Sequence, residues 1–192
     1  MNSKMSTTII AQIAILGALV VVFDYAMKFS GFKIIFPWLP YLKFDFTGIP
    51  IVLSFLLIGL KSGAITSIVA MLAILARSGD VVGASMKALA EFSTILGMSI
   101  GMAVFKKDLK LAKLASFLTG CTARVMIMAM ANLIILPLYT PMTFEAVLLT
   151  TPLTAVFNLI QGLLSIFGGY LIYEALKLRI PSLVKKKETS SP

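Results

Sequence analysis

The stretch YLKFDFTGIPIVLSFLLIGLKSGAITSIVAMLAILAR, residues 41–77, carries the pattern that decides the fold. It opens with a lysine and an aspartate set among aromatic residues, then runs through two solid apolar blocks that break only at GLKSG, residues 59–63. A membrane β-barrel would instead alternate apolar and polar residues in short strands. Gly59 and Gly63 predict a tight reversal. The two blocks are therefore predicted to be consecutive membrane helices, at 47–60 and 62–77.

Four further apolar blocks have the length that a bilayer-spanning helix needs, about 20 residues. They cover residues 8–27, 82–105, 113–138 and 146–176. Charged residues make up only 13% of the 192 residues, against about a quarter in soluble domains. The first block lacks a clear cleavage site, so it is interpreted as a retained helix and not a signal peptide. We expect one all-α membrane domain over 1–192, with six transmembrane helices and a basic cytoplasmic tail at 178–192.

The residue types in the chain exclude several kinds of catalytic and metal site. It has no histidine and a single cysteine, Cys121, which excludes a His/Cys metal site, a histidine-based triad and an internal disulfide. GLKSG is too short for a phosphate-binding loop, so ATP-driven work would need another chain. No nucleophile–base set is evident. We therefore expect a protein that is not an enzyme and that holds no metal or cofactor.

The basic residues indicate how the chain lies in the membrane. The net charge of +9 would suggest nucleic acid in a soluble protein, but here the basic residues fall mainly in loops and the tail. With the N-terminus inside, eleven of the 17 lysines and arginines fall in inner segments, five in outer segments, and Arg124 within a helix. The positive-inside rule then favours a multi-pass plasma-membrane protein with both termini in the cytoplasm and no nucleic-acid partner.

Two ionisable residues fall near the middle of predicted helices, where an unpaired charge is costly. Glu91 lies in the fourth helix and Arg124 in the fifth. Because these helices are consecutive and antiparallel, an ion pair between Glu91 and Arg124 is one interpretation. The other is that one of the two charges faces a polar cavity and meets a ligand. The sequence leaves both open.

Three amides fall at similar depth below the outer surface. Asn132 lies in the fifth helix, and Asn158 and Gln161 lie on one face of the sixth. They would serve either as hydrogen bonds between helices or as the polar groups of a small-molecule pocket with apolar walls. The connection from Asp24 to Thr47 above them is much longer than the usual loop. Long loops often bind ligands, so we favour a pocket beneath a lid.

The first helix carries a face of small residues. Ala11, Ala14 and Ala18 share this face, and the spacing of Ala14 and Ala18 allows another helix to approach closely. If lipid would otherwise cover the face, a partner subunit is the expected occupant.

Taken together, three segments resemble the substrate-binding S components of energy-coupling factor (ECF) transporters, within them the RibU-type riboflavin binders. YLKFDFTGIP is similar to the family's LK-x-DFSD-x-P stretch, MANLIILPLYT (130–140) to its NY-x-x-x-LP-x-Y segment, and FNLIQG (157–162) to its FN-x-x-KG segment. Their order and approximate spacing also match, over nearly the whole chain.

The resemblance implies a six-helix bundle without catalytic activity that takes up riboflavin or a related flavin. The alanine face would dock a transmembrane coupling subunit, itself bound to two ABC-type ATPases, and the S component would topple in the membrane to deliver its cargo. The implied substrate-binding residues are Leu42, Lys43, Phe44, Asp45, Phe46, Thr47, Glu91, Asn132, Tyr139, Asn158 and Gln161.

Three positions depart from the family pattern. Gly48 stands in place of an aspartate, Gln161 in place of a lysine, and Glu91 in place of an asparagine. These changes keep open a different vitamin or precursor, such as a cationic or nucleobase-like compound that pairs with Glu91. A membrane scaffold, in which the buried polar groups serve packing alone, is the remaining alternative.

Overall fold

A computed structural model describes residues 7–106 and 108–181 of the chain. The helices are α1 (Thr7–Phe29), α2 (Gly48–Leu57), α3 (Leu60–Ser78), α4 (Val81–Val104), α5 (Leu109–Tyr139) and α6 (Phe144–Arg179). The predicted all-α class with six helices is confirmed. Residues 182–192 of the predicted basic tail lie outside the described residues.

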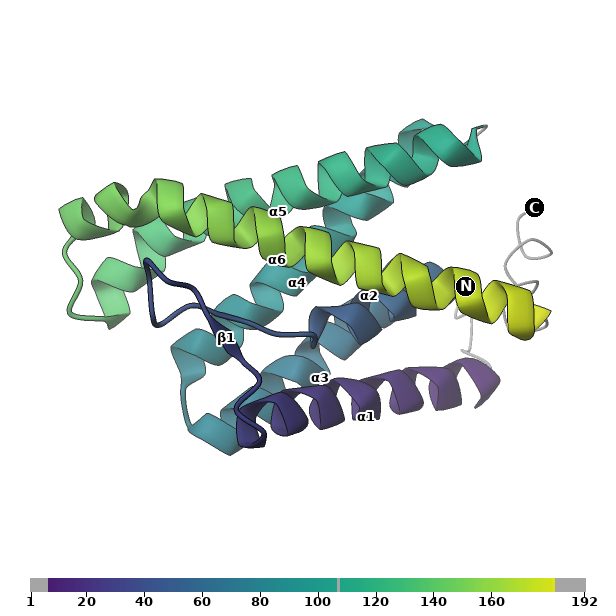
Figure 1. The fold of residues 1–192 in the computed structure, drawn as a ribbon, viewed down its shortest axis with the longest axis horizontal. Coiled ribbons are helices and arrows are strands. Elements are labelled where there is room, and N and C mark those ends of the chain that lie inside the picture. Colours follow the sequence, from purple (N-terminus) through teal and green to yellow (C-terminus); the bar gives the residue numbers. More distant parts are fainter. Residues whose placement is uncertain (1–6, 107, 182–192) are drawn as a thin grey trace, which may run out of the picture.

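The helices differ in their relation to a bilayer. Five of the helices in the described part of the chain are long and apolar enough to span a membrane, and α2 is a short apolar helix of 10 residues. At 1.5 Å per residue, α2 covers about 15 Å, roughly half of the hydrocarbon thickness. It packs against α1, α3, α4 and α6, and nearly all of its residues are buried. It is therefore the central element of the bundle (Figure 1).

Local signals explain where the helices begin and end. Gly59, between α2 and α3, has a φ of 136°, a conformation that favours glycine. The side chains of Asp80 and Asp108 accept hydrogen bonds from backbone N–H groups in the first turns of α4 and α5. Gly63, predicted to help make the reversal, instead lies inside α3, where a Cβ would come within 2.6 Å of Ile95 Cδ1. Its role is close helix packing, and the turn depends on Gly59.

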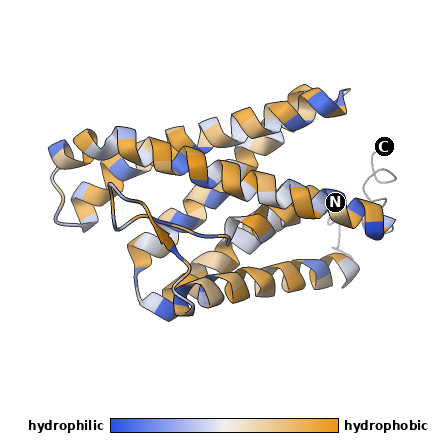
Figure 2. Ribbon diagram, in the orientation of Figure 1, coloured by the Kyte–Doolittle hydropathy of each residue, from blue (hydrophilic) through white to orange (hydrophobic). Residues whose placement is uncertain are grey.

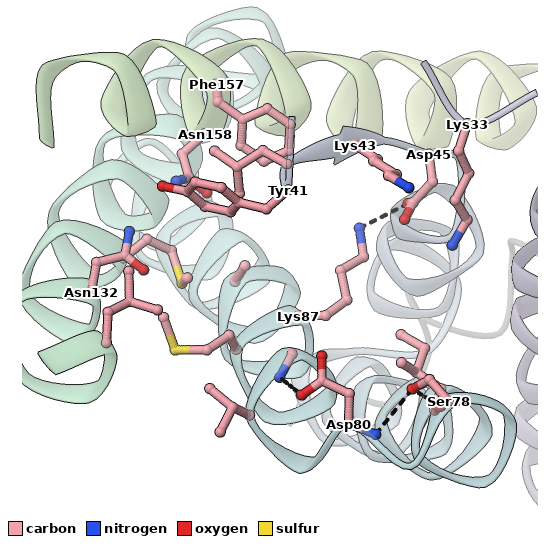
Figure 3. A pocket seen from close by; sticks show the side chains of 18 of the residues that line it. Lys33, Tyr41, Lys43, Asp45, Ser78, Asp80, Lys87, Asn132, Phe157 and Asn158 are labelled. Atoms are coloured by element: carbon pink, nitrogen blue, oxygen red, sulfur yellow. Dashed lines mark hydrogen bonds and ion pairs between the residues drawn. The ribbon is translucent and has the colours of Figure 1, made fainter. Parts of the chain in front are cut away.

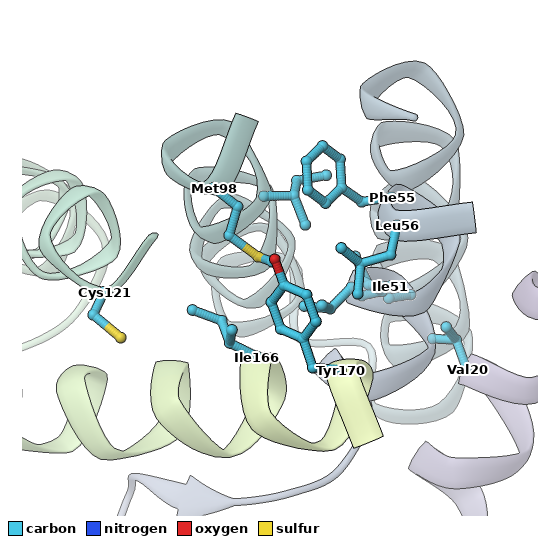
Figure 4. Close-up of a cluster of buried hydrophobic side chains, with 11 residues drawn as sticks. Val20, Ile51, Phe55, Leu56, Met98, Cys121, Ile166 and Tyr170 are labelled. Atoms are coloured by element: carbon cyan, nitrogen blue, oxygen red, sulfur yellow. The ribbon is translucent and has the colours of Figure 1, made fainter. Parts of the chain in front are cut away.

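The main apolar core lies around α2. It contains Val20, Ile51, Phe55, Met98 and Ile166, among other buried residues, as Figure 4 shows. By contrast, large apolar side chains such as Leu118, Ile134 and Leu149 are exposed along α5 and α6, and hydrophobic residues run along all the helices (Figure 2). An apolar exterior of this kind suits contact with lipid.

The connection between α1 and α2, here called the strap (residues 30–47), is an ordered element. Strands β1 (Ile34–Ile35) and β2 (Lys43–Phe44) pair in antiparallel fashion within it. A second apolar cluster holds it against α6: Phe36 and Leu39 of the strap are buried with Phe157, and the ring centroids of Phe44 and Phe157 are 4.7 Å apart. The strap therefore covers one end of the bundle, called below the hairpin end.

Candidate functional site

A cavity of about 490 Å³ opens at the hairpin end. Residues from the strap and from every helix except α2 line it. Two walls can be distinguished in Figure 3. Asn132, Asn158 and Phe157 lie on the side formed by α5 and α6, whereas Lys33, Lys43 and Lys87 lie toward the strap and α4.

The α5–α6 side, called here the amide wall, combines polar amides with apolar side chains. Asn158 is fixed in orientation, because its Nδ2 donates to Thr154 O at 2.9 Å and its Oδ1 accepts from Arg124 Nε at 3.2 Å. Asn132 is 8% exposed, and its side chain makes no hydrogen bond to the described residues. Met128 and Phe157 supply apolar surface beside them. Asn132 thus offers an unengaged donor and acceptor to a ligand.

A chain of charged and polar groups connects the strap to α4, α5 and α6 beside the cavity. Lys87 Nζ lies 2.8 Å from Asp45 Oδ1 and 3.0 Å from Glu91 Oε1. Arg124 Nη1 lies 3.1 Å from the same Glu91 oxygen, and Arg124 continues the chain to Asn158. Buried charges require such compensation. The structure therefore brings Glu91 and Arg124 together, and Arg124 also lines the cavity.

Asp45 is the residue of the strap most strongly held by this network. Besides Lys87, its Oδ1 accepts from Thr47 Oγ1 at 2.6 Å and from Thr47 N at 3.2 Å. Burial acts to raise the pKa of Asp45, but the Lys87 ammonium and the Thr47 hydroxyl together lower that pKa below its ordinary value. The carboxylate is therefore ionised at neutral pH.

Gln161 anchors the backbone of the same residue. Its Nε2 donates to Asp45 O at 2.8 Å, and its Oε1 accepts from Asp45 N at 3.3 Å. Gln161 is fully buried and does not line the cavity. Because it bonds both the N–H and the C=O of Asp45, the Gln161 side chain holds the strap backbone against α6, as the backbone of a paired strand would.

Gly48 makes room for the second Glu91 oxygen. A Cβ placed on Gly48 would collide with Glu91 Oε2 and Ser165 Oγ, and it would lie 2.8 Å from Ser165 Cβ. Neither Glu91 Oε2 nor Ser165 Oγ has a hydrogen-bond partner among the described residues. The second oxygen of the Glu91 carboxylate thus lies against the start of α2, and neither Glu91 nor α2 lines the cavity.

A second ion-pair cluster lies on the α1–α3 side. Asp24 is 1% exposed, and its carboxylate lies 2.7 Å from both Lys33 Nζ and Arg77 Nε. One buried acid is shared by two cations, and both cations line the cavity. This arrangement ties the strap to α1 and α3.

The implied substrate-binding residues fall into two groups. Those that line the cavity are Leu42, Lys43, Asp45, Asn132 and Asn158. Those placed outside its lining are Phe44, Phe46, Thr47, Glu91, Tyr139 and Gln161. Within the second group, Phe44 packs in the strap cluster and Tyr139 is 70% exposed. Glu91 lies outside the lining and is paired with Lys87 and Arg124.

Sequence reasoning missed several residues of the lining, which include Lys28, Lys33, Tyr41, Arg77, Lys87 and Phe157. Asp24, an acid within a predicted membrane helix, could have indicated Lys33 and Arg77. Such a group requires cationic partners, and Lys33 and Arg77 are those partners.

Comparison with solved structures places this arrangement among known folds. One solved chain, described as the S component of a bacterial ECF transporter, superposes with a TM-score of 0.76 at 23% sequence identity, over 92% of this chain and 99% of that chain. The chain has the S-component fold. No protein-family model matches it. No curated protein matches it either.

The match extends over nearly the full length of both chains. At this level of identity the likeness establishes the fold, and the ligand must be argued from the side chains of this chain.

Proposed function

We propose that this chain is the substrate-binding S component of an ECF-type importer, with a flavin of riboflavin size as its cargo. The observation that carries the proposal is an S-component fold with an open cavity of about 490 Å³ that is lined in part by the strap. That volume lies within the usual range for small-molecule sites, about 300–1,000 Å³. A scaffold protein would have no need of such a cavity.

The lining of the cavity supports a flat, heteroaromatic cargo. Tyr41 and Phe157 provide ring surfaces, and Asn132 and Asn158 lie beside them. An amide side chain offers a donor and an acceptor together, which matches the alternating acceptors and donor along the edge of a flavin ring. Asn132 has both groups unengaged by the described residues, so it is assigned to this contact.

The exposed face of α1 supports a partner subunit. Ala11, Ala14 and Ala18 are all exposed, and α1 packs mainly on α2 and α3. Small residues let a second helix approach closely in a membrane. We assign this face to the transmembrane coupling subunit, with ATP hydrolysis by the two ATPases bound to it.

The hairpin end faces outward in the resting orientation, and both termini are cytoplasmic.

The cargo is tested first on purified protein. Mass spectrometry of small molecules extracted from it should detect a flavin, and riboflavin fluorescence should be quenched on binding. Asn132→Ala should weaken that binding by roughly tenfold, the equivalent of one hydrogen bond, because a buried ligand group loses its partner. Gln12→Ala, a change on α1 far from the cavity, serves as the control. Absence of both extracted flavin and quenching would refute the flavin assignment.

The partner is tested by co-purification. Ala14→Leu/Ala18→Leu should prevent co-purification with a coupling subunit and its ATPases while leaving ligand binding intact, because the added side chains separate the helices. Ala103→Leu, at an exposed alanine of α4, is the matched control. Equal recovery of the complex from both variants would show that the alanine face is not the docking surface.

A further inference from the structure

We propose that the cargo carries a negatively charged group, a carboxylate or a phosphate, which binds a cationic wall formed by α1, α3 and the strap. The inference rests on the proposed function, because it assigns the charge of the molecule held in the same cavity. The heteroaromatic body of the cargo would contact the amide wall, and its anionic group would point to the opposite side.

The charges around the cavity are not balanced. Its lining contains the cations Lys28, Lys33, Lys43, Arg77, Lys87 and Arg124 and the acids Asp45 and Asp80. Two further acids, Asp24 and Glu91, lie behind the lining and pair with its cations. Six cations against four acids leave two positive charges without compensation.

The excess lies on one side. Near α4 and α5, Lys87 and Arg124 are matched by Asp45 and Glu91, which lie within 3.1 Å of them. This group is neutral as a whole. Each of its carboxylates is already engaged, so it offers no free acid to a cation in the cavity.

The remaining charges form the cationic wall, made of Lys28, Lys33, Lys43 and Arg77. Asp45, on which Lys33 also acts electrostatically, is already counted with Lys87. The other acids near the wall are Asp24, shared by Lys33 and Arg77, and Asp80, whose side chain accepts from Gly83 N at 2.8 Å. Four cations face two acids. Lys28 and Lys43 form no ion pair with any described residue.

The wall has a fixed part and a movable part. The Lys33 and Arg77 side chains are only 14% and 13% exposed and are held on buried Asp24. Lys28 and Lys43 are exposed lysines, whose long chains can close on a ligand. Uncompensated like charges beside a low-dielectric interior repel one another and attract an anion. An anionic cargo removes this repulsion, whereas a neutral one leaves it.

The direct test compares two ligands that share one ring system. Binding of riboflavin and of riboflavin 5′-phosphate is measured in lipid-free detergent by fluorescence quenching. We expect the phosphate to bind about tenfold more tightly, since two cations act on a dianion across a partly hydrated cavity. In Lys28→Gln/Lys43→Gln that preference should disappear. Equal affinities in the wild-type protein would overturn the proposal.

A matched control separates local from general electrostatics. Lys61→Gln/Lys110→Gln removes the same charge from exposed lysines at the opposite end of the bundle; Lys61 lies about 24 Å along α3 from Arg77. This variant should keep the tenfold preference. A loss equal to that of Lys28→Gln/Lys43→Gln would show that net charge, and not the wall, is responsible.

A second measurement does not depend on the flavin. Inorganic pyrophosphate, compared with chloride at equal ionic strength, should raise the melting temperature of the wild-type protein and of the Lys61→Gln/Lys110→Gln control, because a ligand of the folded state stabilises it. It should not raise that of Lys28→Gln/Lys43→Gln. If pyrophosphate stabilises but no flavin binds, the anion site stands and only the flavin cargo is refuted. Equal shifts in all three proteins would overturn the anion site.

Anionic lipid headgroups also carry a phosphate group, which is a second possible source of the anion at the wall. The melting temperature is therefore also measured in nanodiscs of phosphatidylcholine and of phosphatidylglycerol. We expect pyrophosphate to stabilise the protein in both. If phosphatidylglycerol alone stabilises the wild-type protein but not Lys28→Gln/Lys43→Gln, and pyrophosphate adds nothing, the wall is a headgroup site and the cargo assignment is wrong.

Discussion

Replacing either member of the buried pair Glu91–Arg124 should destabilise the fold strongly, because the change leaves a buried charge without its partner. Glu91 is 0% exposed and Arg124 is 1% exposed, and their closest atoms are 3.1 Å apart. Glu91→Gln keeps a similar volume and leaves Arg124 and Lys87 with one acid fewer. The result is an excess of buried positive charge in the middle of the bundle.

The magnitude follows from that uncompensated charge. Breaking a buried pair on one side costs about 3–5 kcal/mol. Because the carbonyl of the introduced glutamine can still accept a hydrogen bond, we take the lower end of that range, about 3 kcal/mol of unfolding free energy, for Glu91→Gln. Arg124→Gln also loses the hydrogen bonds to Asn158 and Thr94, so about 4 kcal/mol is expected. The double variant removes both charges and should cost less than the sum by about 2 kcal/mol.

The assay is loss of helical circular dichroism on titrating detergent-solubilised protein with dodecyl sulfate. The exposed pair Lys113–Glu174 provides the control, with atoms 3.4 Å apart and side chains 44% and 48% exposed. Glu174→Gln should change the unfolding free energy by at most about 1 kcal/mol. The reasoning is refuted if Glu91→Gln costs no more than Glu174→Gln, or if the effects of Glu91→Gln and Arg124→Gln simply add.

Three further predictions concern the strap and the start of α2. Gln161→Leu removes both hydrogen bonds to the Asp45 backbone; it should cost about 2 kcal/mol, roughly 1 per bond, and speed hydrogen exchange of the strap amides measured by mass spectrometry. Gly48→Ala places a Cβ against Glu91 and Ser165; we expect a loss of about 1–3 kcal/mol from overpacking, seen as a lower melting temperature. The pKa of Asp45 is lowered in the folded protein from an ordinary value of 3.8, so its contribution to stability is complete above that value and is lost as the pH falls through the lower folded-state pKa. The difference in melting temperature between wild type and Asp45→Asn should therefore stay constant from about pH 5 to 8.

Controls for these changes exist in the same chain. Gln12→Leu, on α1, should leave exchange of the strap unchanged. Gly17→Ala should be tolerated, because its Cβ would meet Val69 Cγ1 at an ordinary 3.4 Å. Unchanged strap exchange in Gln161→Leu, or equal melting temperatures for Gly48→Ala and Gly17→Ala, would contradict the contacts described. So would a wild-type advantage over Asp45→Asn that varies between about pH 5 and 8.

The helices could be predicted because membrane insertion imposes a simple local rule. Each spanning segment must satisfy its own backbone and present an apolar exterior, so an apolar block such as 113–138 predicts α5 directly. The reversal at Gly59 was likewise evident from the glycine that interrupts two apolar blocks. Capping by Asp80 and Asp108 depends on neighbouring residues only. These features need no knowledge of which helices touch.

The candidate site was only partly predictable. Asn132 and Asn158 were found because an amide in an apolar helix is conspicuous, and both line the cavity. Gln161 carries the same signal, yet its amide binds the Asp45 backbone. The sequence has no means to separate a ligand contact from a structural hydrogen bond, because the choice depends on which surface lies opposite.

By itself, the sequence determined a membrane bundle of six helices with polar groups below a long charged connection. Hydropathy and helix-ending glycines are properties of neighbouring residues, and they can be recognised without tertiary information. Only the tertiary structure decided how the charges are shared. Lys87 and Arg124 meet Glu91, while Lys33 and Arg77 meet Asp24, and most of these pairings join separate elements. Because electrostatic energy depends on distance and burial, the uncompensated charges of Lys28 and Lys43 could be recognised only in the folded chain.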